Sequence, residues 1–136
     1  MTVAVRYYSQ TGNTKMVAKE IAKQLNVEAK DISFPLSSPV DKLFLGGAIH
    51  MASVDGKLKK YAEQLTPAKI GEVVMFGTSG AVLTIETGLS RALDKNNIKI
   101  APVRLFLHGM IPDAHKLNEN QKEKITNFVK EAKKES

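Results

Sequence analysis

A short polar segment near the N-terminus carries side chains that suit the binding of a phosphate group. It reads Ser9-Gln10-Thr11-Gly12-Asn13-Thr14 and lies between a predicted strand and a predicted helix. Its hydroxyls and amides can donate hydrogen bonds to phosphate oxygens, and Gly12 lets the backbone approach closely. The N–H groups and the dipole at the start of the following helix favour an anion. The same residue types also form ordinary helix N-caps, so a polar turn without a ligand is the alternative.

This segment differs from the common nucleotide-binding motifs. It lacks the spacing and the lysine of GxxxxGK[ST], which argues against nucleotide hydrolysis, and it is not the GxGxxG of dinucleotide-binding domains. The chain contains no cysteine, which excludes disulfides, thiolate metal sites and thiol nucleophiles. Any redox chemistry must therefore belong to a bound cofactor.

The elements that must position the segment alternate between short apolar runs and amphipathic stretches. The pattern predicts strands over Val3–Tyr8, Val27–Ile32, Leu43–Leu45, Val73–Phe76 and Ile98–Leu107. It predicts helices over Lys15–Leu25, Lys57–Leu65 and Ile85–Leu93, and a last helix capped by Asn118 and Gln121. This alternation predicts a single α/β domain, residues 1–136, in which helices cover both faces of a parallel sheet. Pro102 cannot donate a hydrogen bond to a neighbouring strand, which places the last strand at an edge or a bulge.

Four loops are expected at the edge of the sheet where ligands bind, beyond the carboxyl ends of the strands. They are Ser9–Thr14, Ala48–Gly56, Thr78–Gly88 and His108–Leu117. His108 and His115 bracket the last loop, but a metal site would need a third ligand and only Asp113 is near, so we expect solvated histidines and no metal. Glu86 is the one carboxylate of the third loop, and a place at the start of a helix explains it as well as catalysis does.

With these elements in place, the segment SQTGNT resembles the [ST]-x-T-G-N-T phosphate loop of flavodoxins, which also follows their first strand. The resemblance covers essentially the whole chain and implies a doubly wound sheet of five parallel strands in the order 2-1-3-4-5. It implies that the phosphate of FMN is bound by Ser9, Gln10, Thr11, Gly12, Asn13 and Thr14. It implies that the ribityl chain and the ring lie against Ala48, Ile49, His50, Met51, Thr78, Ser79 and Gly80. The implied function is electron transfer between redox partner proteins, with no catalytic side chain.

The chain departs from the flavodoxin pattern in its aromatic residues and its charge. It has no Trp, and neither Ile49–Gly56 nor Thr78–Gly88 contains Phe or Tyr. Stacking on a flavin must then come from His50, Met51, Val82 or Leu83. The formal net charge is +6, whereas flavodoxins are usually strongly acidic.

Two other functions are weighed against the electron carrier. The stretch Asp41–Leu65 also resembles bacterial protoporphyrinogen oxidases of the flavodoxin type. A small FMN-dependent oxidoreductase that acts on a porphyrinogen or a quinone is therefore the alternative. A flavodoxin-fold binding domain that has lost FMN is the third hypothesis, against which the intact SQTGNT segment argues.

Charge and hydropathy limit the class of partner. The 20 Lys and Arg residues are scattered among 14 Asp and Glu residues, and no aromatic residues interleave with a basic cluster, which argues against nucleic-acid binding. No apolar run approaches the roughly 18 residues of a membrane span. The first residues lack the features of a signal peptide. We therefore expect a cytoplasmic protein whose partners are redox proteins rather than a membrane or a nucleic acid.

Overall fold

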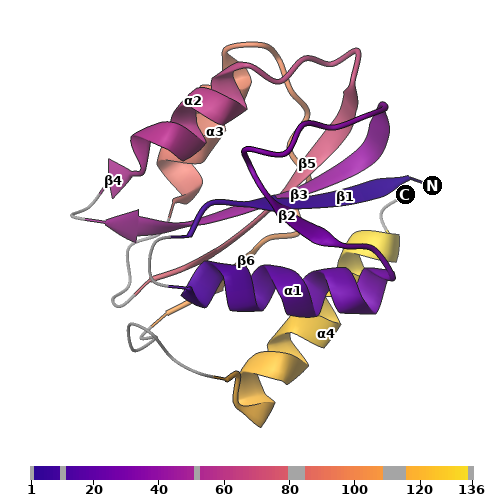
Figure 1. The fold of residues 1–136 in the computed structure, drawn as a ribbon, viewed down its shortest axis with the longest axis vertical. Helices are drawn as coiled ribbons and strands as arrows, with labels where there is room; N and C mark the ends of the chain where they lie inside the picture. The colour runs from indigo at the N-terminus through magenta and orange to yellow at the C-terminus, as the bar shows by residue number, and fades with distance from the viewer. Residues whose placement is uncertain (1, 10–11, 51–52, 80–84, 109–115, 135–136) are drawn as a thin grey trace.

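A row of parallel strands forms the centre of the molecule (Figure 1). The computed structural model describes residues 2–9, 12–50, 53–79, 85–108 and 116–134. The parallel strands are β1 (Val3–Tyr7), β2 (Ala29–Asp31), β3 (Val40–His50), β5 (Ile70–Thr78) and β6 (Leu105–Leu107). Their order across the sheet is β2-β1-β3-β5-β6, and the short strand β4 (Ser53–Val54) pairs antiparallel with the end of β3. The predicted α/β class and the 2-1-3-4-5 order of the parallel strands are confirmed.

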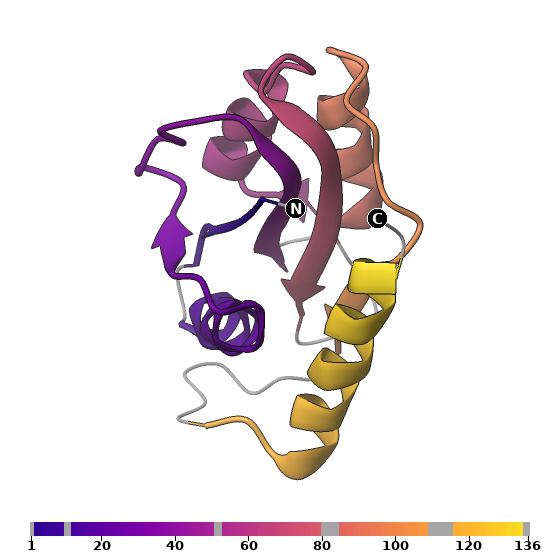
Figure 2. The ribbon, with the colours of Figure 1, turned by 90° about the vertical axis from the view of Figure 1, so that its right-hand side faces the viewer.

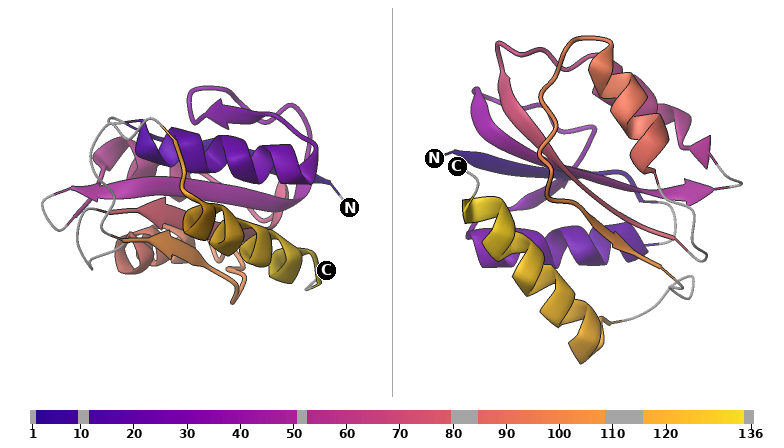
Figure 3. Two further views of the ribbon diagram at one scale, coloured as in Figure 1. Left: turned by 90° about the horizontal axis from the view of Figure 1, so that it is seen from below. Right: turned by 180° about the vertical axis from the view of Figure 1, so that it is seen from behind.

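Helices cover both faces of this sheet (Figures 1 and 3). The helices α1 (Asn13–Leu25) and α4 (Glu119–Lys134) lie on one face, and α2 (Gly56–Glu63) and α3 (Glu86–Asp94) lie on the other. Successive residues of a strand point to opposite faces, so neighbours in β3 belong to different apolar cores. Phe44 packs under α1 and α4, where its ring meets that of Phe128 edge-on with centroids 5.8 Å apart. Leu43 and Leu45 pack under α2 and α3.

Side-chain caps fix where two of the helices begin. The Asp55 carboxylate accepts a hydrogen bond from the N–H of Lys57 at 2.8 Å, at the start of α2. At the start of α4 the cap is reciprocal, because Asn118 Oδ1 accepts from the N–H of Gln121 at 2.8 Å and Gln121 Oε1 accepts from the N–H of Asn118 at 2.9 Å. The predicted cap of the last helix is thereby confirmed.

Among the predicted strand boundaries that are wrong, two have a clear physical reason. The strand expected over Ile98–Leu107 is reduced to β6, preceded only by an isolated bridge between Val73 and Ile100. Pro102 lies between the bridge and β6 and has no N–H to offer β5. The strand expected to end at Gly46 and Gly47 instead continues to His50, because its pairing with β5 runs on past both glycines.

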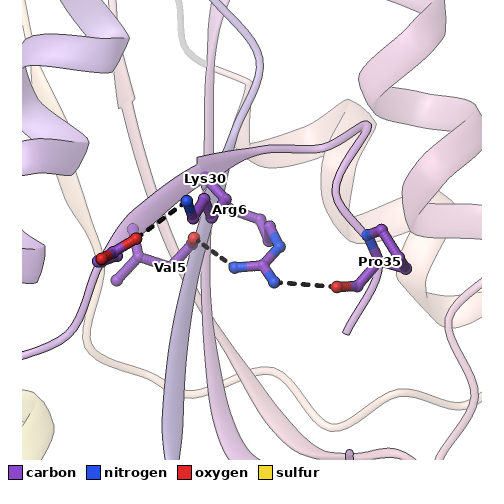
Figure 4. A network of polar contacts seen from close by, with 5 residues as sticks. Val5, Arg6, Lys30 and Pro35 are labelled. Carbon is purple, nitrogen blue, oxygen red and sulfur yellow. Dashed lines mark hydrogen bonds and ion pairs between the residues drawn. The ribbon is translucent and has the colours of Figure 1, made fainter. Parts of the chain in front are cut away.

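The connection from β2 to β3 contains no helix. Residues 32–39, which we call the strap, form turns and bends on the α2 face of the sheet (Figure 2). The buried side chain of Arg6, on β1, fastens the strap (Figure 4). Its Nε donates to the carbonyl oxygen of Phe34 at 3.0 Å, and one Nη donates to that of Pro35 at 3.2 Å. The other Nη donates to the carbonyl oxygen of Val5 at 3.0 Å, so the guanidinium binds strap and strand together.

A buried ion pair lies at the end of the sheet opposite the predicted ligand loops. Lys42 and Glu72 occupy paired positions of β3 and β5, with Nζ and Oε1 3.1 Å apart. Both residues are buried. The Lys42 ammonium also donates to the carbonyl oxygen of Ala132 in α4, and Lys99 approaches the second Glu72 oxygen at 3.6 Å. The pair therefore holds the last turns of α4 against the sheet.

Candidate cofactor site

The predicted site segments meet at the carboxyl edge of the sheet. The strands β1, β3 and β5 are neighbours, and Tyr7 pairs with Gly46 while Ala48 pairs with Thr78. Because Ser9 follows the end of β1, the segment that it begins starts beside the ends of the other two strands. The structure brings to this edge Ser9, Gly12, Asn13, Thr14, Ala48, Ile49, His50, Thr78 and Ser79. Outside the described residues lie Gln10, Thr11, Met51 and Gly80.

The described part of the polar segment forms a tight turn into α1. The Ser9 hydroxyl oxygen accepts a hydrogen bond from the N–H of Gly12 at 3.0 Å. Gly12 has φ of +90°, a conformation that strongly favours glycine, and occupies the N-cap of α1. Glycine has no side chain with which to cap the N–H groups of the first helical turn. The turn therefore differs from the alternative in which a Ser, Thr or Asn at the N-cap satisfies those groups.

A buried pair of hydroxyls joins α1 to the end of β5. Thr14 and Thr78 lie with their Oγ1 atoms 2.8 Å apart, and their exposed fractions are 0% and 5%. Next to Thr78, the Ser79 N–H donates to the carbonyl oxygen of Leu107 at 2.9 Å, which ties the loop after β5 to β6. Sequence reasoning selected both threonines but missed their contact, since nothing local relates residues 64 positions apart.

Glycines allow the backbones of β3 and β5 to approach each other at the site. Gly47 and Gly77 are partners in the register. A Cβ atom on Gly77 would lie 2.7 Å from the carbonyl oxygen of Gly47, and a Cβ on Gly47 would lie 2.4 Å from a methyl carbon of Leu58. The Gly47 carbonyl thus leaves no room for a side chain at Gly77, and a side chain at Gly47 would have to displace Leu58 in the core under α2.

The second predicted loop is shorter than expected. Ala48, Ile49 and His50 were expected in a loop, but they belong to β3, and β4 turns back along them with Ile49 opposite Val54 and His50 opposite Ser53. The antiparallel pairing satisfies backbone groups that a loop would leave to solvent. A two-stranded ribbon of β3 and β4 therefore lies at the sheet edge in place of the expected loop.

The charges described around α1 are compatible with an anionic ligand. The first turn of α1 contains no acidic residue, and Lys15 in that turn is exposed. On the other face of β1, the Lys57 ammonium lies 5.8 Å from the centroid of the Tyr8 ring. Burial raises the pKa of the Tyr7 phenol and Asp31 acts in the same direction, so Tyr7 stays neutral at physiological pH.

Of the remaining residues that were singled out, those within the described ranges form no second site. His108 is exposed, whereas His115 and Asp113 lie outside the described residues. Within the described ranges, no group of His, Asp and Glu side chains is arranged to hold a metal ion. Glu86 is the first residue of α3, where it was expected at a helix start, and it pairs with Arg104. None of the helices within those ranges is long and apolar enough to cross a membrane.

Comparison with known proteins agrees with this architecture. The family model of the flavodoxin domain matches residues 4–135. A flavodoxin from the domain Archaea superposes with a TM-score of 0.73 at 18% identity, over 98% of each chain. Flavodoxin 2 from Bacillus cereus gives 0.72 at 19% identity over the whole of both chains. A flavoprotein from Lactobacillus acidophilus, solved in complex with FMN, gives 0.64 at 15% identity over 78% of this chain and 92% of that chain. No curated protein sequence matches this chain.

Proposed function

This chain belongs to the flavodoxin family, and we propose that residues 1–136 form an FMN-binding domain that carries electrons between partner proteins. The observation that carries the proposal is the start of α1. Gly12 occupies the N-cap of this helix, and the residues before it in the sequence have hydroxyl and amide side chains that can donate hydrogen bonds. A dianionic phosphate suits such a helix start. A structurally similar flavoprotein was solved with FMN, which agrees with this choice of ligand.

The residues present fit a phosphate followed by a flat ring. Ser9, Gly12, Asn13 and Thr14, with Gln10 and Thr11, would hold the phosphate. Within the buried hydroxyl pair one oxygen donates and the other accepts, so the accepting threonine has a proton to offer a phosphate oxygen. The ribityl chain and ring would lie between the β3–β4 ribbon, with Ala48, Ile49, His50 and Met51, and the loop that begins Thr78-Ser79-Gly80. Bound FMN would supply the acceptance and release of electrons, and the protein would orient it and limit its exposure to solvent.

Binding of FMN can be tested through its phosphate. The purified protein, incubated with FMN and passed over a desalting column, is expected to retain the visible flavin spectrum. Riboflavin has the same ring without the phosphate, so its Kd is expected to be about 100-fold or more higher. Changing Thr11 and Thr14 to Ala should remove the difference between the two ligands, whereas changing the exposed Thr66 to Ala should not. Equal affinity of the unchanged protein for FMN and riboflavin would contradict the proposal.

A second function, an FMN-dependent oxidoreductase with a small substrate, is favoured by one observation. Neither Ile49–Gly56 nor Thr78–Gly88 contributes a Phe, Tyr or Trp ring, so apart from His50 no aromatic side chain of these segments would compete with a planar substrate for the face of the flavin. The two functions differ in steady-state turnover. A carrier needs a partner protein to pass electrons on. With no other protein added, an enzyme would reduce a quinone while a small-molecule reductant is oxidised, or oxidise a porphyrinogen while a small-molecule electron acceptor is reduced.

A further inference from the structure

A groove runs along α2 on the side that faces the strap. It consists of two adjoining hollows of about 340 and 260 Å³, both lined by Tyr61 and Gln64. The first also touches Tyr8 and Ile32 near the carboxyl edge of the sheet, and the second touches Leu36 and continues toward the start of β5. We propose that this strap groove binds an acidic segment of a partner protein, anchored by apolar side chains.

The groove exists because of the way in which β2 is connected to β3. A crossover between parallel strands usually carries a helix, which would cover this part of the sheet. Eight extended residues span at most about 26–29 Å, so the strap is long enough to cross the sheet without one. A helix is about 10 Å wide, and a single extended chain cannot fill that width. The space between α2 and the strap therefore stays open. Arg6 holds the strap in place through the carbonyl groups of Phe34 and Pro35.

One stripe of α2 forms a wall of the groove. Lys57, Lys60, Tyr61 and Gln64 all line it, and their spacing of i, i+3, i+4 and i+7 places them along one face of the helix. The opposite, core-facing side of α2 buries Leu58. The wall thus presents two ammonium groups and an aromatic ring in a fixed row, about 10 Å long from first to last residue.

The strap supplies apolar surface at the other wall. Ile32 and Leu36 are partly buried against the core under α2 and α3. Phe34 is 51% exposed, and it is the one large hydrophobic side chain that is exposed among the described residues. Lys30 lies beside it, with Nζ 5.1 Å from the ring centroid. Phe34 does not line either hollow, but its chain neighbours Ser33 and Pro35 do, and an exposed aromatic side chain is typical of an interaction surface.

Charge identifies the chemistry of the occupant. The side chains that line the two hollows include Lys57, Lys60 and Lys69, against Asp31 as their carboxylate. That carboxylate already accepts a hydrogen bond from the N–H of Ser33 at 2.8 Å. Complementary potential favours a partner that brings negative charge, whereas a basic segment would be repelled. An acidic segment with apolar side chains is therefore complementary to the lysines and to the apolar residues that line the groove.

The position of the groove indicates how a partner could receive electrons, an inference that rests on the proposed binding of FMN. Tyr8, which lines the groove, immediately precedes Ser9, and Lys57 lies in the first turn of α2 beyond the β3–β4 ribbon. A partner held there would lie beside bound FMN. Because the groove is short, the contact area is small, and small interfaces form weak complexes that dissociate rapidly. Rapid release suits a partner that exchanges electrons repeatedly.

Three synthetic amphipathic peptides of about 16 residues test the proposal by chemical-shift mapping on the ¹⁵N-labelled protein, with and without added FMN. The first has Glu and Leu at helical spacing, the second replaces Glu with Lys, and the third replaces Leu with Ser. At about 0.15 M salt the Debye length is about 8 Å, so distant charges contribute little. Only the first peptide is expected to bind, and its shifts should concentrate in residues 31–36 and 57–65.

Two pairs of substitutions with equal change in net charge separate docking from general attraction. Lys57→Glu with Lys60→Glu should raise the Kd of the first peptide about tenfold or more. Lys19→Glu with Lys23→Glu, which are exposed on α1, should change it less than about twofold. Phe34→Ser, at a position that is 51% exposed, should raise the Kd several-fold.

The outcome does not depend on flavin binding, so failure of the groove and failure of the FMN proposal are distinguishable. Three results would each overturn the proposal that the groove binds an acidic segment. They are shifts centred on α1 and α4, equal binding of the Lys or Ser peptide, and no shifts in residues 31–36 or 57–65. A protein that binds the first peptide at the groove but retains no FMN would keep the groove and refute the electron carrier.

Discussion

The hydroxyl pair between α1 and β5 gives the sharpest prediction about the site. Thr14→Val keeps the shape of the side chain but leaves the buried Oγ1 of Thr78 without its partner at 2.8 Å. An unpaired buried hydroxyl costs about 1–3 kcal/mol of unfolding free energy. Thr78→Val should cost a similar amount. The double variant replaces both partners with apolar groups, so it should lose clearly less than the sum of the two, with a coupling of about 1 kcal/mol or more.

The assay is urea denaturation of the FMN-free protein, with the exposed Thr66→Val as a control that is expected to change the unfolding free energy by less than about 0.5 kcal/mol. Additive losses in the double variant would refute the coupling inferred from the distance. A second readout concerns the ligand. If a hydroxyl of the pair donates to phosphate, Thr14→Val should also raise the Kd for FMN about 10-fold or more, since a charge-assisted hydrogen bond contributes about 1.5–3 kcal/mol. The Kd for riboflavin should stay within about twofold, and an unchanged FMN affinity would leave the pair a purely structural role.

Three further predictions concern the frame around the site. Lys42→Met should lower the unfolding free energy by about 3 kcal/mol, because it leaves the buried Glu72 carboxylate without its main partner; chemical denaturation with no change in midpoint would contradict this. Gly77→Ala should cost about 1–3 kcal/mol in the same assay, because its Cβ would press on the Gly47 carbonyl, and it should also weaken FMN retention; a variant as stable as the parent would show that β3 and β5 are less close. Burial raises the pKa of the Tyr61 phenol above its ordinary 10.0, so ionisation favours the unfolded chain and stability should fall as the pH rises beyond about 10. Tyr61→Phe should flatten that alkaline loss in thermal denaturation curves, and identical curves for parent and variant would be evidence against it.

Local patterns in the sequence were sufficient for the helices and for their alternation with strands, whereas the order of the strands came from the resemblance to flavodoxins. The apolar stripe of α4 and its Asn118–Gln121 cap involve residues that are close together in the chain, so periodicity and capping rules find them. The strands that failed are those whose ends depend on a neighbour. Gly46 and Gly47 predict a stop when taken alone, but the partner strand β5 continues the pairing beyond them.

The polar segment at Ser9–Thr14 was predictable because its chemistry lies in consecutive residues. The contacts that complete the site were not, since Thr14 and Thr78 come together only when the sheet forms. The strap gave one usable signal. Arg6 is a charged residue within an otherwise apolar strand, and a buried guanidinium needs several carbonyl partners. The carbonyl groups that accept from Arg6 belong to the strap, which contains two prolines. Because the strap is not paired in the sheet, the sequence offered no register from which to identify those carbonyl groups.

The two outer strands of the sheet bear on how the protein behaves at high concentration. Both β2 and β6 have only three residues, although β3 between them has eleven. An outer strand offers unpaired N–H and C=O groups on which another molecule can build an intermolecular sheet. Lys30 and Asp31 place charges on the outer strand β2, and Pro102 lies shortly before the other outer strand, β6. The short outer strands β2 and β6 therefore offer little backbone for an intermolecular sheet. They also separate the longer central strands, which carry the site, from other molecules on both sides.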